Sequence, residues 1–460
     1  MEEAARNMYH AIPKDETGRI GHNVVRYAFH RLLLHEHGRF VRGLEPQGEL
    51  WNNFPSKRWQ EWVPSYLQDV SERWSHSHGL TLRELSVLAA AIEDLVHREA
   101  IERLRGIYQT CSVAESILLN AERAEELSDS FLMIYLRGGN FTAEDADQAW
   151  RKLHTFKLRY SGWNDVKAWA QSAQKNDSDF VDGTLDFEMA TRVAEAIGSR
   201  FGQFNDIECK DLKETLSAVA QKLGRVRLST FYNMSLHSHW KFTEKVPYLR
   251  DIGALDESIP EQPMVIVPNY VGSRPQCLEA SHFYAICCRN ECEDLVNELE
   301  RQVATPTATT SRTAEVVNSF STTFASRSHS PELSPRLLTR LDQVAEANAG
   351  RVPLHSRLFA QWMHHAFSRE YPYPHEAGTV SPQTPDEWMQ VAGHTNTKAT
   401  EEEMVCHVSG PCAGGAQALS ANSDGGVDGV SDGSWIFLGV TRRSCSWSSQ
   451  PGHGAETTRQ

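Results

Sequence analysis

The sequence has no long uninterrupted apolar run and no excess of basic residues. Its most apolar segment, residues 85–95, is interrupted by Glu93 and Asp94, whereas a membrane-spanning helix needs about 20 apolar residues. The formal net charge of −14 argues against a general nucleic-acid binder, because such proteins carry a basic surface. The first residues also have neither the positive start nor the apolar core of a signal peptide. We therefore expect no transmembrane segment, no nucleic-acid partner and a cytoplasmic location.

Short motifs of nucleotide-binding and hydrolytic enzymes are missing as well. Neither Gly-x-x-x-x-Gly-Lys, which cradles phosphates, nor Gly-x-Ser-x-Gly, which presents a nucleophile, occurs in the chain. The residues are 40% hydrophobic and 23% charged, which is enough for two or three ordinary globular domains. The sequence therefore favours a non-catalytic protein, although it leaves an enzyme open.

Helix signals dominate what is present. The stretch TLRE at 81–84 forms a capping box before an apolar-periodic segment, and SVAE at 112–115 repeats the pattern. One stretch differs, PMVIVPNYV at 263–271, whose β-branched residues between prolines predict a short extended segment. From about residue 408 the chain is rich in Gly, Ser and Asp, a composition typical of disorder. The predicted fold is all-α, with one short extended segment and a disordered C-terminal tail.

A short motif, Gly-Arg-Val-x-Leu, occurs twice, in LGRVRLSTFY at 223–232 and in AGRVPLHSRLF at 349–359. Each copy follows a helical pattern and precedes another helical pattern that carries an aromatic residue. This arrangement is the skeleton of an EF-hand, in which a loop of about 12 residues makes a sharp turn at a glycine in position 6. An apolar residue at position 8 of such a loop pairs with a partner loop.

A third segment, SDFVDGTLDFEMATRV at 178–193, resembles an EF-hand loop that continues into its exit helix. In this numbering Gly183 takes position 6 and Leu185 takes position 8. We therefore predict that residues 161–250 form an EF-hand-like pair, with Leu185 and Val226 adjacent across a short bridge.

The calcium ligands of these loops have largely been replaced. Calcium needs 6–8 oxygen ligands, including early carboxylates and a bidentate Glu at position 12. The loop at 178–189 has Ser178 and Phe180 at positions 1 and 3 and Met189 at position 12. The two Gly-Arg-Val loops have no carboxylate at positions 1, 3 or 5. Weak calcium candidates remain in a bulged first loop: Asp177, Asp179, Asp182, Asp186 and Glu188. We expect calcium binding to be weak or lost, and no other cofactor.

Several long stretches resemble those of an uncharacterised protist family of multi-helical proteins with degenerate EF-hand-like modules and a Cys-rich block. They are GRVRLSTFY, HWKFTEKVPYLRDIGALDES, VIVPNYV, CLEASHFYAICCRNECEDL and GRVPLHSRLFAQWMHHAFSREYPYPHEAGT, and they span about residues 200–400. The resemblance implies no known activity. Such proteins usually have Cys where this chain has Tyr371, which implies that one clustered cysteine lacks its partner here.

Four of the nine cysteines lie close together and are candidates for disulfides: Cys277, Cys287, Cys288 and Cys292. Vicinal cysteines do not readily bond to each other, so a disulfide from Cys287 or Cys288 should reach a distant residue. The cluster leaves a lumenal or extracellular location open. A metal site is a second possibility and would use His364, His365, His375, Cys288 and Cys292. The spacing lacks the repeated Cys-x-x-Cys pattern of strong zinc sites.

The sequence thus predicts five consecutive regions. They are a helical region at 1–160, an EF-hand-like pair at 161–250, an extended connector with a Cys-rich helix at 251–302, a C-terminal helical module with a second EF-like half at 303–407, and a tail at 408–460. The favoured function is a non-catalytic interaction or scaffold protein with a protein partner. The alternative is a metal-dependent enzyme that uses the cysteines at 277–292 and the histidines at 355–375.

Overall fold

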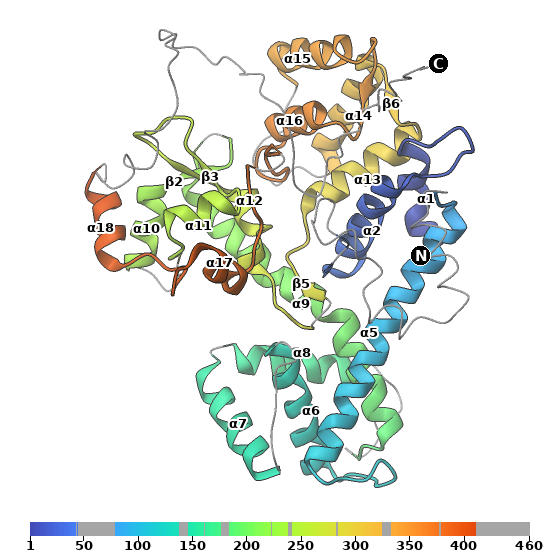
Figure 1. The fold of residues 1–460 in the computed structure, drawn as a ribbon, viewed down its shortest axis with the longest axis vertical. Coiled ribbons are helices and arrows are strands. Elements are labelled where there is room, and N and C mark those ends of the chain that lie inside the picture. Colours follow the sequence, from blue (N-terminus) through green and yellow to red (C-terminus); the bar gives the residue numbers. More distant parts are fainter. Residues whose placement is uncertain are drawn as a thin grey trace, which may run out of the picture. The chain divides into compact units, whose positions relative to one another are not determined.

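The computed structural model describes residues 1–42, 44, 79–137, 146–160, 162–175, 184–221, 223–237, 242–281, 284–323, 333–376 and 379–410 (Figure 1). The chain divides into two compact units. Unit 1 comprises residues 1–211 and 276–306, and unit 2 comprises residues 212–275 and 307–460. The units therefore do not follow the five consecutive regions expected from the sequence, because each combines stretches that are far apart along the chain.

Unit 1 is built mainly from long helices. Its helices are α1 (Glu2–Ala11), α2 (His22–His37), α5 (Leu82–Thr110), α6 (Ala121–Leu136), α7 (Ala146–Arg159), α8 (Trp163–Lys175), most of α9 (Phe187–Val219) and α13 (Glu291–Val303). Two short strands, β1 (Arg39–Val41) and β5 (Tyr284–Ile286), pair antiparallel. Helix α1 packs on α5 and on α13, and α5 packs on α6.

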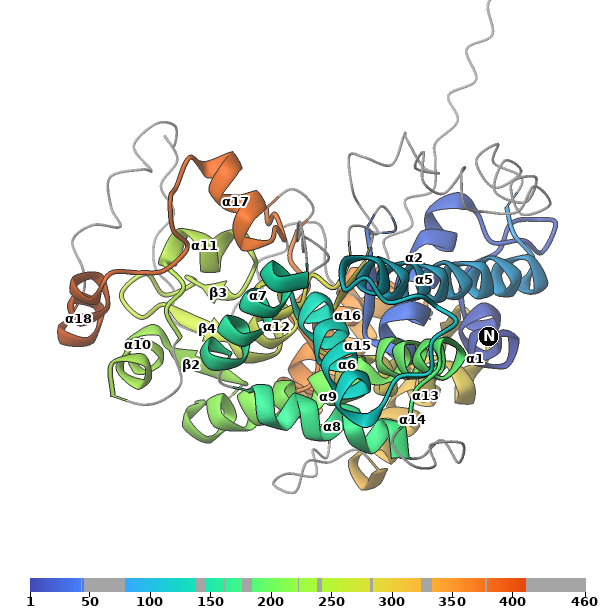
Figure 2. The same ribbon diagram turned by 90° about the horizontal axis from the view of Figure 1, so that it is seen from below.

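Unit 2 contains shorter helices and two small sheets. Its helices are α10 (Leu228–His237), α11 (Val246–Asp251), α12 (Val267–Val271), α14 (Thr310–Thr323), α15 (Pro335–Glu346), α16 (Arg357–Ala366), α17 (Pro385–Ala392) and α18 (Glu401–Ser409). One sheet has the order β2 (Arg225–Arg227), β4 (Met264–Ile266), β3 (Leu255–Asp256), and the other pairs β6 (Thr307–Ala308) with β7 (Val352–Pro353). Helix α18 lies along α10, as both ribbon views show (Figures 1 and 2).

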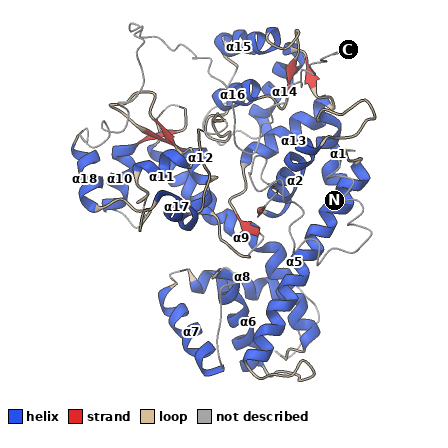
Figure 3. Cartoon of the chain, in the orientation of Figure 1, coloured by secondary structure: helices blue, strands red, loops and turns tan. Residues whose placement is uncertain are grey.

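The all-α prediction is confirmed, since helices dominate the described residues and all strands are short (Figure 3). The expected extended segment is β4, although it spans only Met264–Ile266 before the chain turns into α12. Of the predicted tail, residues 411–460 lie outside the described residues. Among the described helices, none is long and apolar enough to cross a membrane.

A repeated pairing organises both units. Eight buried residues, each lying shortly before a helix, pair antiparallel in twos, and we call them the bridge residues. The four pairs are Ile20–Leu80, Leu119–Leu185, Val226–Val265 and Ala308–Val352. In the first two pairs both main-chain hydrogen bonds are made, with N–O distances of 2.9–3.0 Å. Each pair joins two helix-turn-helix segments through main-chain hydrogen bonds and buried side chains.

The prediction that Leu185 and Val226 are adjacent is wrong. Leu185 pairs with Leu119 in unit 1, and Val226 pairs with Val265 in unit 2. Helix α9 runs unbroken from one segment to the other, so its two ends take separate partners. The helix-turn-helix pair predicted at 161–250 is therefore divided between two pairs.

Helix starts agree with the sequence at one predicted cap and differ at another. Thr81 and Glu84 make the expected capping box at the start of α5. SVAE at 112–115, however, starts no helix, because α6 begins at Ala121 with Asn120 as its N-cap. The bridge residue Leu119 needs extended backbone immediately before that cap, so the tertiary pairing moves the start of the helix along the chain.

Inside unit 1, helices α2 and α13 are joined by a buried ion cluster. The Arg31 guanidinium lies 2.5 Å from a carboxylate oxygen of Glu293 and 2.5 Å from one of Glu300, and all three side chains are at most 1% exposed. Burial raises the pKa of Glu293 to about 7, although the neighbouring Arg31 lowers it. Arg31 also donates to Asn297 at 3.1 Å. One arginine thus holds two buried glutamates, which makes it essential to this helix contact.

Candidate functional site

Three of the four bridge pairs contain the same tripeptide, a glycine, an arginine and a β-branched bridge residue. They are Gly18-Arg19-Ile20, Gly224-Arg225-Val226 and Gly350-Arg351-Val352. The three glycines have φ values of 77°, 61° and 80°, in the left-handed region that glycine tolerates. At Gly224 a Cβ atom would also lie 2.2 Å from the carbonyl oxygen of Ser368. The tripeptide thus makes a sharp turn that leads directly into a bridge pair.

The arginine of the first tripeptide crosses to the partner segment. Arg19 donates to the carbonyl oxygen of Gly79 at 3.2 Å and to Glu84 at 3.1 Å. Gly79 precedes the bridge residue Leu80, and Glu84 completes the cap of α5. The neighbouring Asp15 accepts from the N–H groups of Thr17 and Arg19, each at 2.9 Å, so the turn is closed by its own side chain.

The second arginine is more buried and makes more contacts. Arg225 donates from Nε to Asp256 at 2.6 Å and from one terminal nitrogen to the carbonyl oxygen of Leu223 at 3.1 Å. The same terminal nitrogen lies 3.2 Å from Nε2 of His364. Asp256 belongs to β3, which pairs with β4, so Arg225 ties both edges of this small sheet together.

The third arginine again reaches the strand that pairs with its own. Arg351 donates to the Oγ1 of Thr307 at 2.7 Å and to the carbonyl oxygen of the same residue at 2.9 Å. Thr307 precedes the bridge residue Ala308 in β6. In all three pairs, therefore, a guanidinium donates to a main-chain oxygen of a loop or strand at the bridge. We call these contacts the arginine bridges.

Replacing Arg225 by methionine is expected to lower the free energy of unfolding by about 1.5–3 kcal/mol, because hydrogen bonds to charged groups contribute that much. The matched control is Arg227→Met on the same strand, where the side chain is exposed. Urea denaturation of both variants measures the difference. The control is expected to stay within about 0.5 kcal/mol of the wild type. An equal loss of unfolding free energy in both variants would show that the arginine bridge of Arg225 does not stabilise the fold.

The weak calcium candidates are only partly visible. Asp177, Asp179 and Asp182 lie outside the described residues. Asp186 accepts a hydrogen bond from the N–H of Met189 at 2.7 Å at the start of α9. Glu188 is 85% exposed and pairs with Arg192 one turn further along the helix. The two described carboxylates therefore interact with groups of the protein itself.

The histidine cluster is held by main-chain oxygens. His364 is fully buried, and its Nδ1 lies 2.7 Å from the carbonyl oxygen of Tyr371, which can only accept. Nδ1 therefore carries the proton, and Nε2 accepts from Arg225. Burial, and then Arg225, lowers the pKa of His364 to about 3. His375 contacts the carbonyl oxygen of Gly253 through Nε2 at 2.7 Å. These contacts commit both nitrogens of His364 within the protein.

The proposed metal ligands are not brought into one cluster. Within the described ranges there is no group of three or more His, Cys, Asp or Glu side chains arranged to hold a metal ion. The sulfur of Cys288 is bonded to that of Cys209. Cys292 is fully buried in the first turn of α13 and is disulfide-bonded as well. All four clustered cysteines are therefore bonded, and the expectation that one of them lacks a partner is wrong. Burial lowers the pKa of His365 to about 4, so this side chain is neutral at pH 7.

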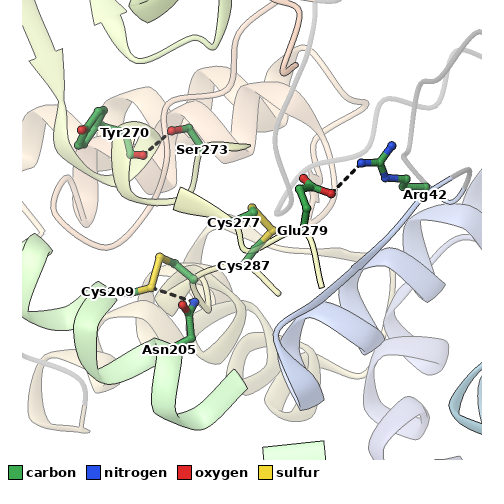
Figure 4. Close-up of a disulfide and its surroundings, with 9 residues drawn as sticks. Arg42, Asn205, Cys209, Tyr270, Ser273, Cys277, Glu279 and Cys287 are labelled. Atoms are coloured by element: carbon green, nitrogen blue, oxygen red, sulfur yellow. Dashed lines mark hydrogen bonds and ion pairs between the residues drawn. A yellow bond between two sulfur atoms is a disulfide. The ribbon is translucent and has the colours of Figure 1, made fainter. Parts of the chain in front are cut away.

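Two disulfides of the cluster have both of their cysteines among the described residues, and both lie within unit 1. Cys277 is bonded to Cys287, and Cys288 is bonded to Cys209 (Figure 4). The vicinal cysteines thus do not bond to each other. Cys288 reaches a residue 79 positions away, as expected, although Cys209 was not among the predicted residues, whereas Cys287 bonds to a residue only 10 positions away. Disulfides are typical of oxidising environments.

Comparisons of the chain with models of known protein families, with curated proteins and with solved structures found no match. The resemblance to a protist family therefore stays an expectation from the sequence.

Sequence reasoning identified two of the three Gly-Arg tripeptides. The third, at residues 18–20, has Ile in place of Val, and a search for Gly-Arg followed by any β-branched residue would have found it. The bridge residues Leu80, Leu119 and Leu185 lack the tripeptide. Only their position one residue before an N-cap (Thr81, Asn120 and Asp186) marks them in the sequence.

Proposed function

We propose that this chain is a non-catalytic helical interaction or scaffold protein, built on an EF-hand-like framework whose calcium binding is weak or lost. The observation that carries this proposal is the set of arginine bridges. In a calcium-loaded EF-hand, a cation is surrounded by loop oxygens and by the Glu at position 12. Here guanidinium groups, which are permanently charged, donate to main-chain oxygens around the paired loops.

The first bridge pair makes the comparison concrete. With the bridge residue Leu80 at position 8, Glu84 four residues later takes position 12 of its loop. Its carboxylate contacts Arg19 at 3.1 Å and also accepts from the N–H of the capping residue Thr81 at 2.9 Å. A positive group and a helix cap thus already satisfy the carboxylate that would otherwise face an ion. This supports a framework that holds together without calcium.

A protein partner is the binding class that we propose for such a scaffold. The turn before the bridge residue Leu119 exposes two large apolar side chains, Ile117 at 49% and Leu118 at 62%. These two neighbouring apolar side chains offer a contact point for a protein partner. No residue is assigned a catalytic role.

Isothermal titration of the full chain with calcium tests the proposal. We expect either no binding heat or a dissociation constant weaker than the range of roughly 10⁻⁷–10⁻⁵ M that sensor sites show. The melting temperature should also be the same with calcium and with a chelator, because the arginine bridges need no ion.

A dissociation constant inside the sensor range would contradict the proposal. Asp182→Ala would then locate the site, since its loss of binding would point to the loop at 178–189. Binding that survives Asp182→Ala would point to a different loop. A large rise of the melting temperature with calcium would likewise count against an ion-independent framework.

A further inference from the structure

The two disulfides lie where the chain passes between the two units. The chain leaves unit 1 after Asp211 and returns to it at Gln276. Cys209 lies two residues before the first of these points, and Cys277 lies one residue after the second. Their partners, Cys288 and Cys287, are neighbours in the sequence. The two disulfides therefore link both ends of the segment 212–275 to the same dipeptide of unit 1.

The dipeptide Cys287–Cys288, which we call the anchor, is held in place by main-chain hydrogen bonds. It follows β5, which pairs with β1, and the N–H of Cys287 donates to the carbonyl oxygen of Gly38 at 2.8 Å. Ile286 forms two further hydrogen bonds with Leu278, at 2.7 and 2.8 Å, inside the loop that Cys277 and Cys287 close. Figure 4 shows the Cys277–Cys287 bond and the sulfur of Cys209 in this region. The anchor is thus fixed by main-chain contacts that do not depend on the disulfides.

Helix α9, which carries the chain out of unit 1, contains two glycines before Cys209. Gly198 and Gly202 lie in its interior, and glycine weakens a helix because it gains the most backbone freedom when the helix opens. Gly202 packs closely on α2, since a Cβ there would lie 2.3 Å from the carbonyl oxygen of His37. Beyond Gly202, the Cys209–Cys288 bond is the covalent link that holds the end of α9 to the anchor.

We propose that the two disulfides form a redox-controlled clamp on the segment that enters and leaves unit 2. In the oxidised protein both ends of residues 212–275 are fixed to Cys287–Cys288. A dithiol reductant opens each bond by thiol–disulfide exchange: the dithiol loses two electrons and two protons to become a disulfide, and the cysteine pair gains them as two thiols. The end of α9 is then released from Cys287–Cys288, and the helix can open beyond its glycines.

The two bonds differ in access, so they should open in order. Cys277 is only partly buried, whereas Cys209 and Cys288 are 6% and 3% exposed. Attack by a thiolate requires access to a sulfur atom. Reduction should therefore open Cys277–Cys287 first, which frees the chain near Gln276, where it returns to unit 1. It should open Cys209–Cys288 second, which frees the end of α9.

Hydrogen exchange of the full chain, oxidised and reduced with a dithiol, tests the clamp. Alkylation and intact-mass spectrometry count the opened bonds. We expect amides at 203–219 to exchange about tenfold faster or more after full reduction, because local opening of a helix end is controlled by its local stability. Amides at 187–197 of the same helix should stay unchanged.

The double variant Cys209→Ser, Cys288→Ser should reproduce the reduced exchange pattern without reductant. The double variant Cys277→Ser, Cys287→Ser should free only the chain near Gln276 and leave the amides of residues 203–219 protected from exchange. Cys111→Ser, at the free cysteine that follows α5, is the control and should behave as the wild type. Unchanged exchange at residues 203–219 after complete reduction would overturn the clamp. Equally faster exchange across all of unit 1 would also overturn it, because the bonds would then serve general stability only.

Discussion

Replacing Trp362 by alanine is expected to lower the free energy of unfolding by about 3–5 kcal/mol, the usual loss for a buried aromatic residue. Trp362 is 2% exposed and stacks on Phe359 with ring centroids 5.6 Å apart. Its Nε1–H donates to the carbonyl oxygen of Leu337 at 2.8 Å, which fixes α16 on α15. The variant loses packing and also the side-chain hydrogen bond to the carbonyl oxygen of Leu337. Urea denaturation followed by circular dichroism measures the effect.

The comparison for Trp362→Ala is a chain that lacks residues 410–460. Because this part of the sequence is dominated by Gly, Ser, Ala and Asp, ordering it would cost about 1–2 kcal/mol per residue in backbone entropy, with little burial to offset that cost. The truncation should therefore melt within a few degrees of the full chain. A truncated protein that melts as low as Trp362→Ala would show that the fold extends beyond α18.

Replacing Arg31 by methionine is expected to cost about 3–5 kcal/mol, because the change leaves buried carboxylates without their counter-charge. Glu293 and Glu300 are at most 1% exposed, and Arg31 is the guanidinium that contacts both. Methionine keeps most of the side-chain volume, so packing changes little. The matched control is Arg98→Met. Arg98 forms an ion pair with Asp94 in which both side chains are about half exposed, so losing the pair should lower the free energy of unfolding by at most about 1 kcal/mol.

The loss in Arg31→Met should depend on pH in a defined direction. Burial raises the folded-state pKa of Glu293 to about 7 even with Arg31 present, and removing the guanidinium raises it further. A carboxyl group whose pKa is raised on folding destabilises the folded protein at pH values above the pKa that the group has in the unfolded chain. Protonation of the group relieves that loss of stability as the pH falls. The difference between variant and wild type should therefore shrink between pH 8 and pH 5. A difference that is constant over this range would mean that lost packing, not charge, explains the effect.

The sequence by itself determined the helical class and the places where the chain turns sharply. Helical periodicity and caps are local properties, so TLRE at 81–84 predicts the start of α5 correctly. The turn at Gly224 is a local property too, because a positive φ favours glycine whichever segment the turn later pairs with. The same reasoning locates the β-branched bridge residues Val226 and Val352, both of which are fully buried.

Only the tertiary structure decided which segments pair. The bridge residues join through main-chain N–H and C=O groups, which are the same at every position and carry no information about the partner. Leu185 could therefore be assigned to Val226 from the sequence, whereas the fold pairs it with Leu119. The same holds for Cys209, whose bond to Cys288 spans 79 residues, because the spacing of cysteines along a chain does not fix their connectivity. Contacts between distant residues depend on how helices pack around a shared core, and this is a property of the whole chain, not of any short stretch.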